Sequence, residues 1–189
     1  NCQVGQYQGQ SPSTITACKT CNKGMFAASA TVTSCASCAS GKYQGQGSST
    51  ITACKTCGAG QAAAKTASSC SNCQVGQYQG QNPSTVNACK TCDKGTFASS
   101  ATVTSCASCA TGKYQGQTAS TVNACKTCNK GTFASSATVT SCASCASGKY
   151  QGQTVSSITA CKDCPAGRFY DGRVGADTSA LCEECSAGF

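Results

Sequence analysis

Cysteine is the residue type in this chain that could carry out the most kinds of chemistry. The chain has 21 cysteines among 189 residues and no histidine. Cysteines in the pattern C-x-x-C can form disulfides, bind zinc as thiolates or act as a redox dithiol. All except Cys2 fall into ten such pairs, which are Cys18/Cys21, Cys35/Cys38, Cys54/Cys57, Cys70/Cys73, Cys89/Cys92, Cys106/Cys109, Cys125/Cys128, Cys142/Cys145, Cys161/Cys164 and Cys182/Cys185.

The spacing between pairs favours disulfides. Separations of 16 positions alternate with separations that are mostly 14 positions. If the second Cys of each pair bonds forward to the next pair, every segment closes its own loop, and each closure stabilises the fold by ~3 kcal/mol in the loop-entropy estimate. Cys185 is then unpaired or bonded beyond this segment. The predicted bridges are Cys2–Cys18, Cys21–Cys35, Cys38–Cys54, Cys57–Cys70, Cys73–Cys89, Cys92–Cys106, Cys109–Cys125, Cys128–Cys142, Cys145–Cys161 and Cys164–Cys182.

Two other interpretations of the cysteines stay open at this point. Two C-x-x-C pairs about fifteen residues apart are also typical of structural zinc, and five tetrathiolate sites would use twenty cysteines and leave Cys2 over. The loops contain Ser, Thr, Ala and Gln rather than the larger apolar residues usual around a zinc knuckle. A redox dithiol needs a βαβ scaffold, which this sequence does not predict.

The composition argues against catalysis. Without histidine the chain lacks the usual general base, and its acidic residues are few outside the last 27 positions. Leu, Ile, Val and Phe together number only 18, so cross-links must replace an ordinary hydrophobic core. We therefore expect a protein that is not an enzyme, with no catalytic residue, metal or cofactor, located outside the cell or at its surface, where disulfides persist.

The loops form a tandem array of two alternating modules. Module A reads C-x-x-G-[QK]-Y-Q-G-Q and module B reads C-[ND]-K-G-x-F-A in most copies. Together they give a period of 35 or 36 residues, typical of quasi-one-dimensional arrays. The predicted fold is small and disulfide-rich: an elongated rod of short β ribbons and coil with little or no helix. The predicted repeats are 2–37, 38–72, 73–108, 109–144 and 145–185, the last with a divergent second module, followed by 186–189 as the start of a truncated next module.

Each module opens with a glycine three residues after a cysteine, followed two residues later by an aromatic ring. We expect the glycine to reverse the chain at positive φ and the ring to cover the nearest disulfide. The module at Gly60 lacks a ring and is expected to pack least well. Strands of about 3 to 5 residues are expected at 13–16 and 101–105. The other openings are Gly5/Tyr7, Gly24/Phe26, Gly41/Tyr43, Gly76/Tyr78, Gly95/Phe97, Gly112/Tyr114, Gly131/Phe133, Gly148/Tyr150 and Gly167/Phe169.

The pattern resembles the ephrin-receptor-like cysteine-rich repeat. The segment Cys164-Pro165-Ala166-Gly167-Arg168-Phe169 is most similar to the opening of that family's module, although only Cys164 is followed by Pro. The resemblance implies an extracellular, disulfide-linked repeat of the kind found in receptor ectodomains and in protist surface and flagellar-hair (mastigoneme) proteins. Tumour-necrosis-factor-receptor-like and EGF-like modules are also small and cysteine-rich, but they have other cysteine spacings.

Charge and polar patterning point to candidate partners. Residues 1–162 carry twelve lysines and one acidic residue, Asp93. We expect no nucleic-acid partner and no direct membrane span; the candidates are copies of the chain itself, through lateral assembly into a homopolymer, and acidic polysaccharide. One lysine recurs in each C-K-[TD]-C segment: Lys19, Lys55, Lys90, Lys126 and Lys162. Exposed amides are expected in the Y-Q-G-Q segments at Gln8, Gln44, Gln79, Gln115 and Gln151.

The sequence thus predicts an extracellular structural protein, part of a fibre, surface coat or flagellar hair. The alternative is the stalk of a cell-surface receptor or adhesin, and a multi-zinc array is a minor one. The phases of Cys2 and Cys185 predict that modules continue on both sides. For a glycoprotein the only signals are N-x-C sites at Asn87 and Asn123, because Pro83 excludes the sequon at Asn82.

Overall fold

The computed structural model describes residues 2–9, 17–47, 52–118, 123–153, 158–169 and 182–184. The chain divides into two compact units. Unit 1 comprises residues 1–90 with 100–105, and unit 2 comprises 91–99 with 106–189. Among the described residues there is no helix, and hence none that could cross a membrane. The fold is small, disulfide-rich and repetitive, as the sequence predicts.

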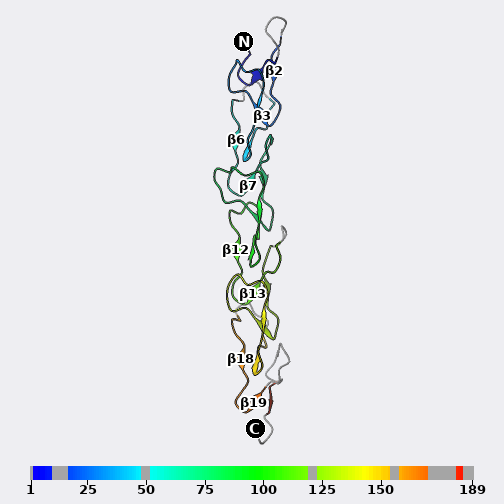
Figure 1. Cartoon of the computed structure of the whole chain (residues 1–189), viewed down its shortest axis with the longest axis vertical. Helices are drawn as coiled ribbons and strands as arrows, with labels where there is room; N and C mark the ends of the chain where they lie inside the picture. Colours follow the sequence, from blue (N-terminus) through cyan, green and yellow to red (C-terminus); the bar gives the residue numbers. More distant parts are fainter. Residues whose placement is uncertain are drawn as a thin grey trace. The chain divides into compact units, whose positions relative to one another are not determined.

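Twenty strands of two residues each form ten two-stranded sheets in the described part of the chain, each sheet joining consecutive strands (Figure 1). The first ten are β1 (Gln6–Tyr7), β2 (Lys19–Thr20), β3 (Met25–Phe26), β4 (Ala36–Ser37), β5 (Lys42–Tyr43), β6 (Lys55–Thr56), β7 (Gln61–Ala62), β8 (Ser71–Asn72), β9 (Gln77–Tyr78) and β10 (Lys90–Thr91). The others are β11 (Thr96–Phe97), β12 (Ala107–Ser108), β13 (Lys113–Tyr114), β14 (Lys126–Thr127), β15 (Thr132–Phe133), β16 (Ala143–Ser144), β17 (Lys149–Tyr150), β18 (Lys162–Asp163), β19 (Arg168–Phe169) and β20 (Glu183–Glu184).

The C-x-x-C spacing has a simple structural origin. The two residues between the cysteines are the second strand of a sheet, so the first Cys closes one module and the second Cys opens the next. In module 7, for example, Lys113 pairs with Thr127 and Tyr114 pairs with Lys126 in antiparallel register. We number the modules 1 to 10 from the first disulfide loop to the last, so odd modules are A and even modules are B.

A glycine at positive φ starts each module, as expected. Its φ lies between 74° and 89° in all ten modules, a region that side chains with a Cβ rarely adopt. In module 3 the Gly41 carbonyl then accepts a hydrogen bond from the Cys57 amide at 2.9 Å. The glycine thus turns the chain and closes the module at the same time.

The strands do not lie where β propensity placed them. The expected strand at 101–105 is a turn and bend, whereas strands form beside the cysteines. Thr102 itself has a φ of 64°, which is incompatible with a strand. The other expected strand, at 13–16, lies outside the described residues.

The core consists of cysteine, alanine and glutamine. The opening cysteines of modules 1 to 9 are buried, and so is the residue that follows the ring in modules 2, 3 and 5 to 9. That residue is alanine in B modules and glutamine in A modules: Ala27, Ala98 and Ala134, and Gln44, Gln79, Gln115 and Gln151. The rings themselves are only half-buried, and Phe169 is 43% exposed. The rings therefore contribute less to the core than these smaller side chains, and contact of each ring with a disulfide stays a prediction.

The module without a ring packs like its neighbours. In module 4, Ala62 takes the position of the ring and Ala63 that of the buried residue, and both are only 3% exposed. The Gly60 amide donates to Gln79 O at 2.8 Å, and the Gly60 carbonyl accepts from the Cys73 amide at 2.8 Å. Our expectation of poor packing was wrong because it assigned the core to the ring.

Backbone hydrogen bonds join successive modules within each unit. In unit 1, Gly41 N donates to Ala63 O at 2.8 Å and Gln44 N to Ala67 O at 3.1 Å, which links module 3 to module 4. In unit 2, Gly112 N donates to Ala134 O at 3.0 Å and joins module 7 to module 8 in the same way. Each module therefore pairs with its sequence neighbour as well as closing on itself.

Candidate functional site

The disulfides form a ladder with one rung per module. The structure joins the ten pairs that the spacing predicts, with Cα–Cα distances of 5.5 to 5.8 Å. These distances are ordinary for disulfides. Cys185 lies outside the described residues.

This pairing contradicts the zinc alternative. Of the twenty cysteines that five tetrathiolate sites would need, nineteen are in disulfides, and the other, Cys185, is outside the described residues. Across the described ranges no cluster of three or more His, Cys, Asp or Glu side chains could hold a metal ion. The chemistry of these cysteines in the structure is covalent closure of the modules.

Buried glutamines connect modules at the A-to-B joints, and Gln44, Gln79 and Gln115 each connect three modules. In unit 2, Gln115 Nε2 donates to Thr96 O in module 6 at 3.2 Å, and also to Gln117 O. Gln115 Oε1 accepts from Gln117 N. The main chain of Gln115 accepts from Gly95 N at 2.7 Å and donates to Val139 O in module 8 at 3.2 Å. We call this set of five bonds the glutamine clip.

The same side-chain bonds recur in modules 3, 5 and 9. Gln44 bonds to Met25 O at 3.1 Å, Gln79 to Gln61 O at 2.9 Å and Gln151 to Thr132 O at 3.2 Å. Each of the three also bonds the backbone two residues ahead. The amide forms hydrogen bonds with buried backbone groups that have no access to water. The cost of burying the polar glutamine is therefore offset.

The clip corrects one expectation from the sequence. Four of the five Y-Q-G-Q amides expected at the surface are only 3 to 4% exposed and bond within the chain. Gln8, in module 1, is half-buried. The prediction of a glutamine-bearing face for lateral contacts was therefore wrong at Gln44, Gln79, Gln115 and Gln151, since these amides already have intramolecular partners.

The positive-φ glycines have a second role that the sequence did not reveal. A Cβ added at Gly24 would lie 1.9 Å from Thr66 O, and one added at Gly60 would lie 2.1 Å from Thr102 O. In both cases the threonine belongs to the module two positions further along the chain. Each contact is a close backbone-to-backbone approach that no other residue permits.

The threonine on the other side of this contact has an unusual conformation. Thr66, Thr102 and Thr138 all have a φ of 64°, which is rare for β-branched residues. Their amides donate to the carbonyls of Cys38, Cys73 and Cys109 at 3.0 to 3.3 Å. We call the glycine, the threonine and this bond the glycine seat; it couples a module to the two that follow within a unit.

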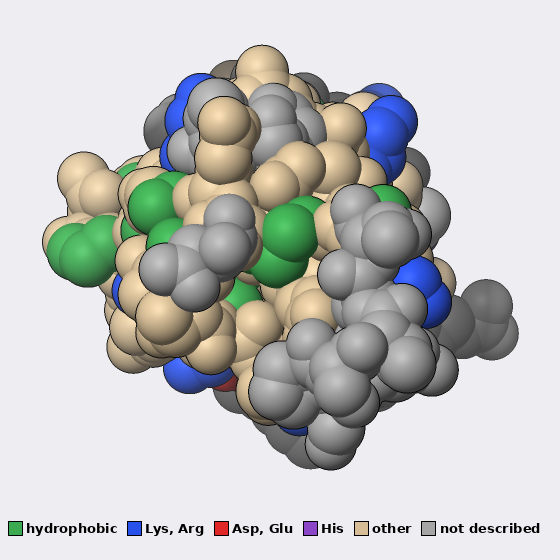
Figure 2. Space-filling model, turned by 90° about the horizontal axis from the view of Figure 1, so that it is seen from above, with side chains coloured by type: hydrophobic (Ala, Val, Ile, Leu, Met, Phe, Trp, Pro, Cys, Tyr) green, Lys and Arg blue, Asp and Glu red, His purple; other side chains and the backbone are tan. Residues whose placement is uncertain are grey.

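The recurring lysines lie on the second strand of every A module. Lys19, Lys55, Lys90, Lys126 and Lys162 are all exposed. An ion pair joins Lys149 and Asp163, and both side chains are too exposed for it to stabilise the fold much. In the face shown in Figure 2, Lys and Arg atoms appear at several places, and hydrophobic atoms form separate small spots.

The sequence matches no protein-family model and no curated protein. The resemblance to ephrin-receptor-like repeats therefore stays a prediction that rests on the cysteine and glycine pattern.

Proposed function

We propose that this chain is a load-bearing segment of an extracellular structure such as a fibre, a surface coat or a flagellar hair. The observation that supports it is the combination of a disulfide in every module with a clip or seat at the joints between modules. Disulfides limit how far each module can be stretched. The clip and the seat resist bending between modules, because a hinge would leave buried polar groups without partners.

The near-identity of the repeats supports a structural role over display of a ligand site. Residues 92–109 and 128–145 differ only at Asp93 against Asn129. Equivalent surfaces at fixed intervals suit a fibre, whereas a receptor stalk needs only length. The oxidising location that disulfides require agrees with both. The ephrin-receptor-like resemblance is part of the same proposal.

Stretching single molecules tests this function directly. When the oxidised chain is stretched, the path through each module crosses one disulfide, whose Cα atoms are 5.5 to 5.8 Å apart, and then three residues of backbone. At ~3.5 Å per residue, each module adds about 16 Å. Ten modules then reach about 160 Å under force, whereas the fully reduced chain of 189 residues reaches about 650 Å.

We expect the oxidised chain to stop near the shorter length and to lengthen about fourfold when reductant is added. An oxidised chain that extends almost as far as the reduced one would refute the load-bearing role, since the bridges would then not carry the force. A chain held by zinc would instead lengthen on addition of a chelator without any reductant.

A further inference from the structure

The fold accounts for several of the residues that recur in the A modules, but not for the tyrosine on the first strand or the lysine on the second. Cysteine forms the bridge, the first glutamine forms the clip, and the glycine of Y-Q-G-Q is required by close approach: a Cβ at Gly116 would lie 2.7 Å from Thr140 O. The tyrosine and the lysine remain. In the part of the chain that is described, the tyrosine rings are half-buried with no hydrogen bond to their hydroxyls, and the lysines are exposed.

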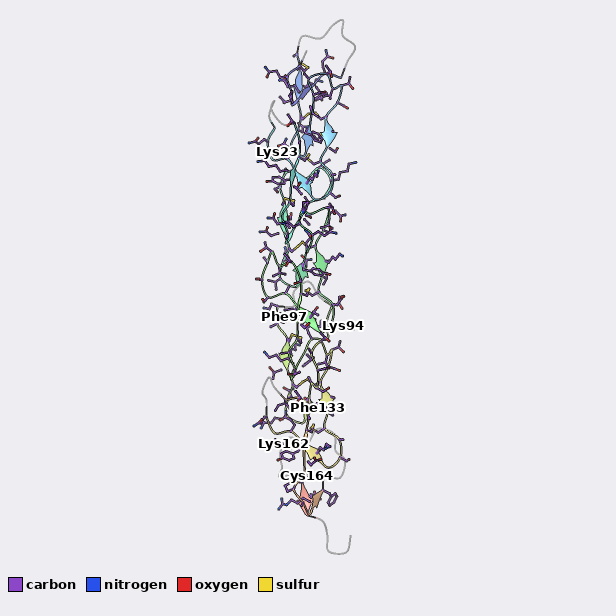
Figure 3. The ribbon with its side chains drawn as sticks, turned by 90° about the vertical axis from the view of Figure 1, so that its left-hand side faces the viewer. Lys23, Lys94, Phe97, Phe133, Lys162 and Cys164 are labelled. Atoms are coloured by element: carbon purple, nitrogen blue, oxygen red, sulfur yellow. A yellow bond between two sulfur atoms is a disulfide. The ribbon has the colours of Figure 1, made fainter. Side chains whose placement is uncertain are left out.

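The tyrosine and the lysine are paired directly opposite each other on the two neighbouring strands of the sheet. Tyr114 is the Cα partner of Lys126, and the same register joins Tyr7 with Lys19, Tyr43 with Lys55 and Tyr150 with Lys162. At the corresponding positions of B modules a phenylalanine faces an alanine, as in Phe97 with Ala107 and Phe133 with Ala143. Figure 3 labels Phe97 and Phe133 in unit 2. The same fold thus carries a cationic, hydroxyl-bearing pair only in A modules.

Each of two successive pairs lines a small hollow. In module 5 the hollow has a volume of about 150 Å³, and in module 7 about 200 Å³. Five of the six lining residues are at equivalent positions, and the sixth is not: the residues are Tyr78, Gln79, Gly80, Gln81, Val86 and Lys90 in the first, and Tyr114, Gln115, Gly116, Gln117, Ala124 and Lys126 in the second. In module 1, Tyr7 and Lys19 line a wider groove.

The size and lining of the hollows define the ligand. They are smaller than the ~300 to 1,000 Å³ of pockets for drug-sized molecules, so each accepts one ring-sized group. The ring of tyrosine offers an apolar face, its hydroxyl a hydrogen bond, and the lysine a positive charge at the rim. Repeated hollows in one chain suit a polymer whose units repeat, because weak contacts at several sites add through multivalency.

We propose that each of the two hollows, in modules 5 and 7, binds one anionic sugar of an acidic polysaccharide. The sugar ring lies against the tyrosine, and its carboxylate or sulfate group contacts the lysine opposite. With Asp93 the one acidic residue among positions 1–162, few carboxylates compete for these lysines. This adhesive function goes beyond the load-bearing role and does not depend on it.

Two pairs of matched variants of the full chain test the site. Lys90→Gln with Lys126→Gln removes both hollow lysines, and Lys94→Gln with Lys130→Gln removes two exposed lysines of B modules; each double variant loses the same two charges. Tyr78→Leu with Tyr114→Leu is matched by Phe97→Leu with Phe133→Leu. The probes are polygalacturonate for carboxylate, dextran sulfate for sulfate, and neutral dextran.

We expect the hollow variants to bind the preferred polyanion about tenfold more weakly, from a loss of about threefold per site, and the B-module variants to change by less than about twofold. Thermal unfolding and retention of all ten disulfides check the fold of each variant. Neutral dextran should not bind detectably.

Three outcomes would overturn the proposal. Equal losses of affinity in both lysine double variants would show that binding depends only on net charge. Absence of binding to either polyanion would show that the hollows are not a polysaccharide site. Tighter binding of single-stranded DNA with the same tyrosine and lysine dependence would assign the hollow to base stacking. None of these outcomes alters the length measured under force, so the two proposals fail separately.

Discussion

The two glutamines of one Y-Q-G-Q segment should differ sharply in importance, although the sequence does not distinguish them. Gln115 makes three side-chain hydrogen bonds and is 4% exposed, whereas the side chain of Gln117 is exposed and only its main chain is used. Replacing Gln115 by alanine removes all three bonds and leaves their backbone partners unsatisfied. At about 1 kcal/mol per bond, the joint should lose about 3 kcal/mol.

Amide hydrogen exchange at Gly95 measures this loss, because its N–H crosses the joint to Gln115 O at 2.7 Å. If the joint opens as a unit, 3 kcal/mol corresponds to exchange more than about a hundredfold faster. Gln117→Ala is the matched control and should change the rate by less than about threefold, or roughly 0.5 kcal/mol. Comparable acceleration in both variants, or none in Gln115→Ala, would show that the clip does not hold the joint.

Three further predictions follow from the joints and the bridges. Gly95→Ala should destabilise unit 2 by more than Gly148→Ala in thermal unfolding. Both glycines have positive φ, so alanine at either position incurs about 1 to 2 kcal/mol of backbone strain. Only at Gly95 does the new Cβ also meet a backbone atom, Thr138 O at 2.2 Å, whereas no described atom lies within 4 Å of a Cβ at Gly148. Gln115→Glu should destabilise more at neutral pH than below about pH 4, because the charged carboxylate has no proton to donate to Thr96 O and Gln117 O; an effect independent of pH would contradict this reasoning. Peptide mapping without reductant should recover Cys21 joined to Cys35, and a peptide with Cys18 joined to Cys21 would disprove the ladder.

The features that could be predicted are those in which one residue type has one physical use. A cysteine count and spacing that close every loop identify the bridges, and a glycine at a fixed distance from a cysteine identifies the turn. Both follow from local chain geometry. The repeat period follows from the same regularity.

The features that could not be predicted depend on contacts between modules. The segment 101–105 has strong β propensity, but Thr102 is held at positive φ by the Cys73 carbonyl and by close approach to Gly60. The buried amides look like surface residues because glutamine is usually exposed. The tyrosine-lysine pair needed the strand register, although its restriction to A modules was visible in the sequence.

The alternation of alanine and glutamine in the core constrains how the gene for such a chain can change length. The amide of an A module reaches a strand carbonyl of the preceding B module, as Gln115 reaches Thr96 O, and the next B module contributes only an alanine, Ala134, at the matching site. Loss or duplication of a single module would place two modules of one kind side by side and leave one joint without its amide or with an extra one. Gain or loss of a complete pair preserves every joint. Tandem duplication should therefore proceed in steps of 35 or 36 codons, and sister copies should be most alike one whole pair apart, as 92–109 and 128–145 are.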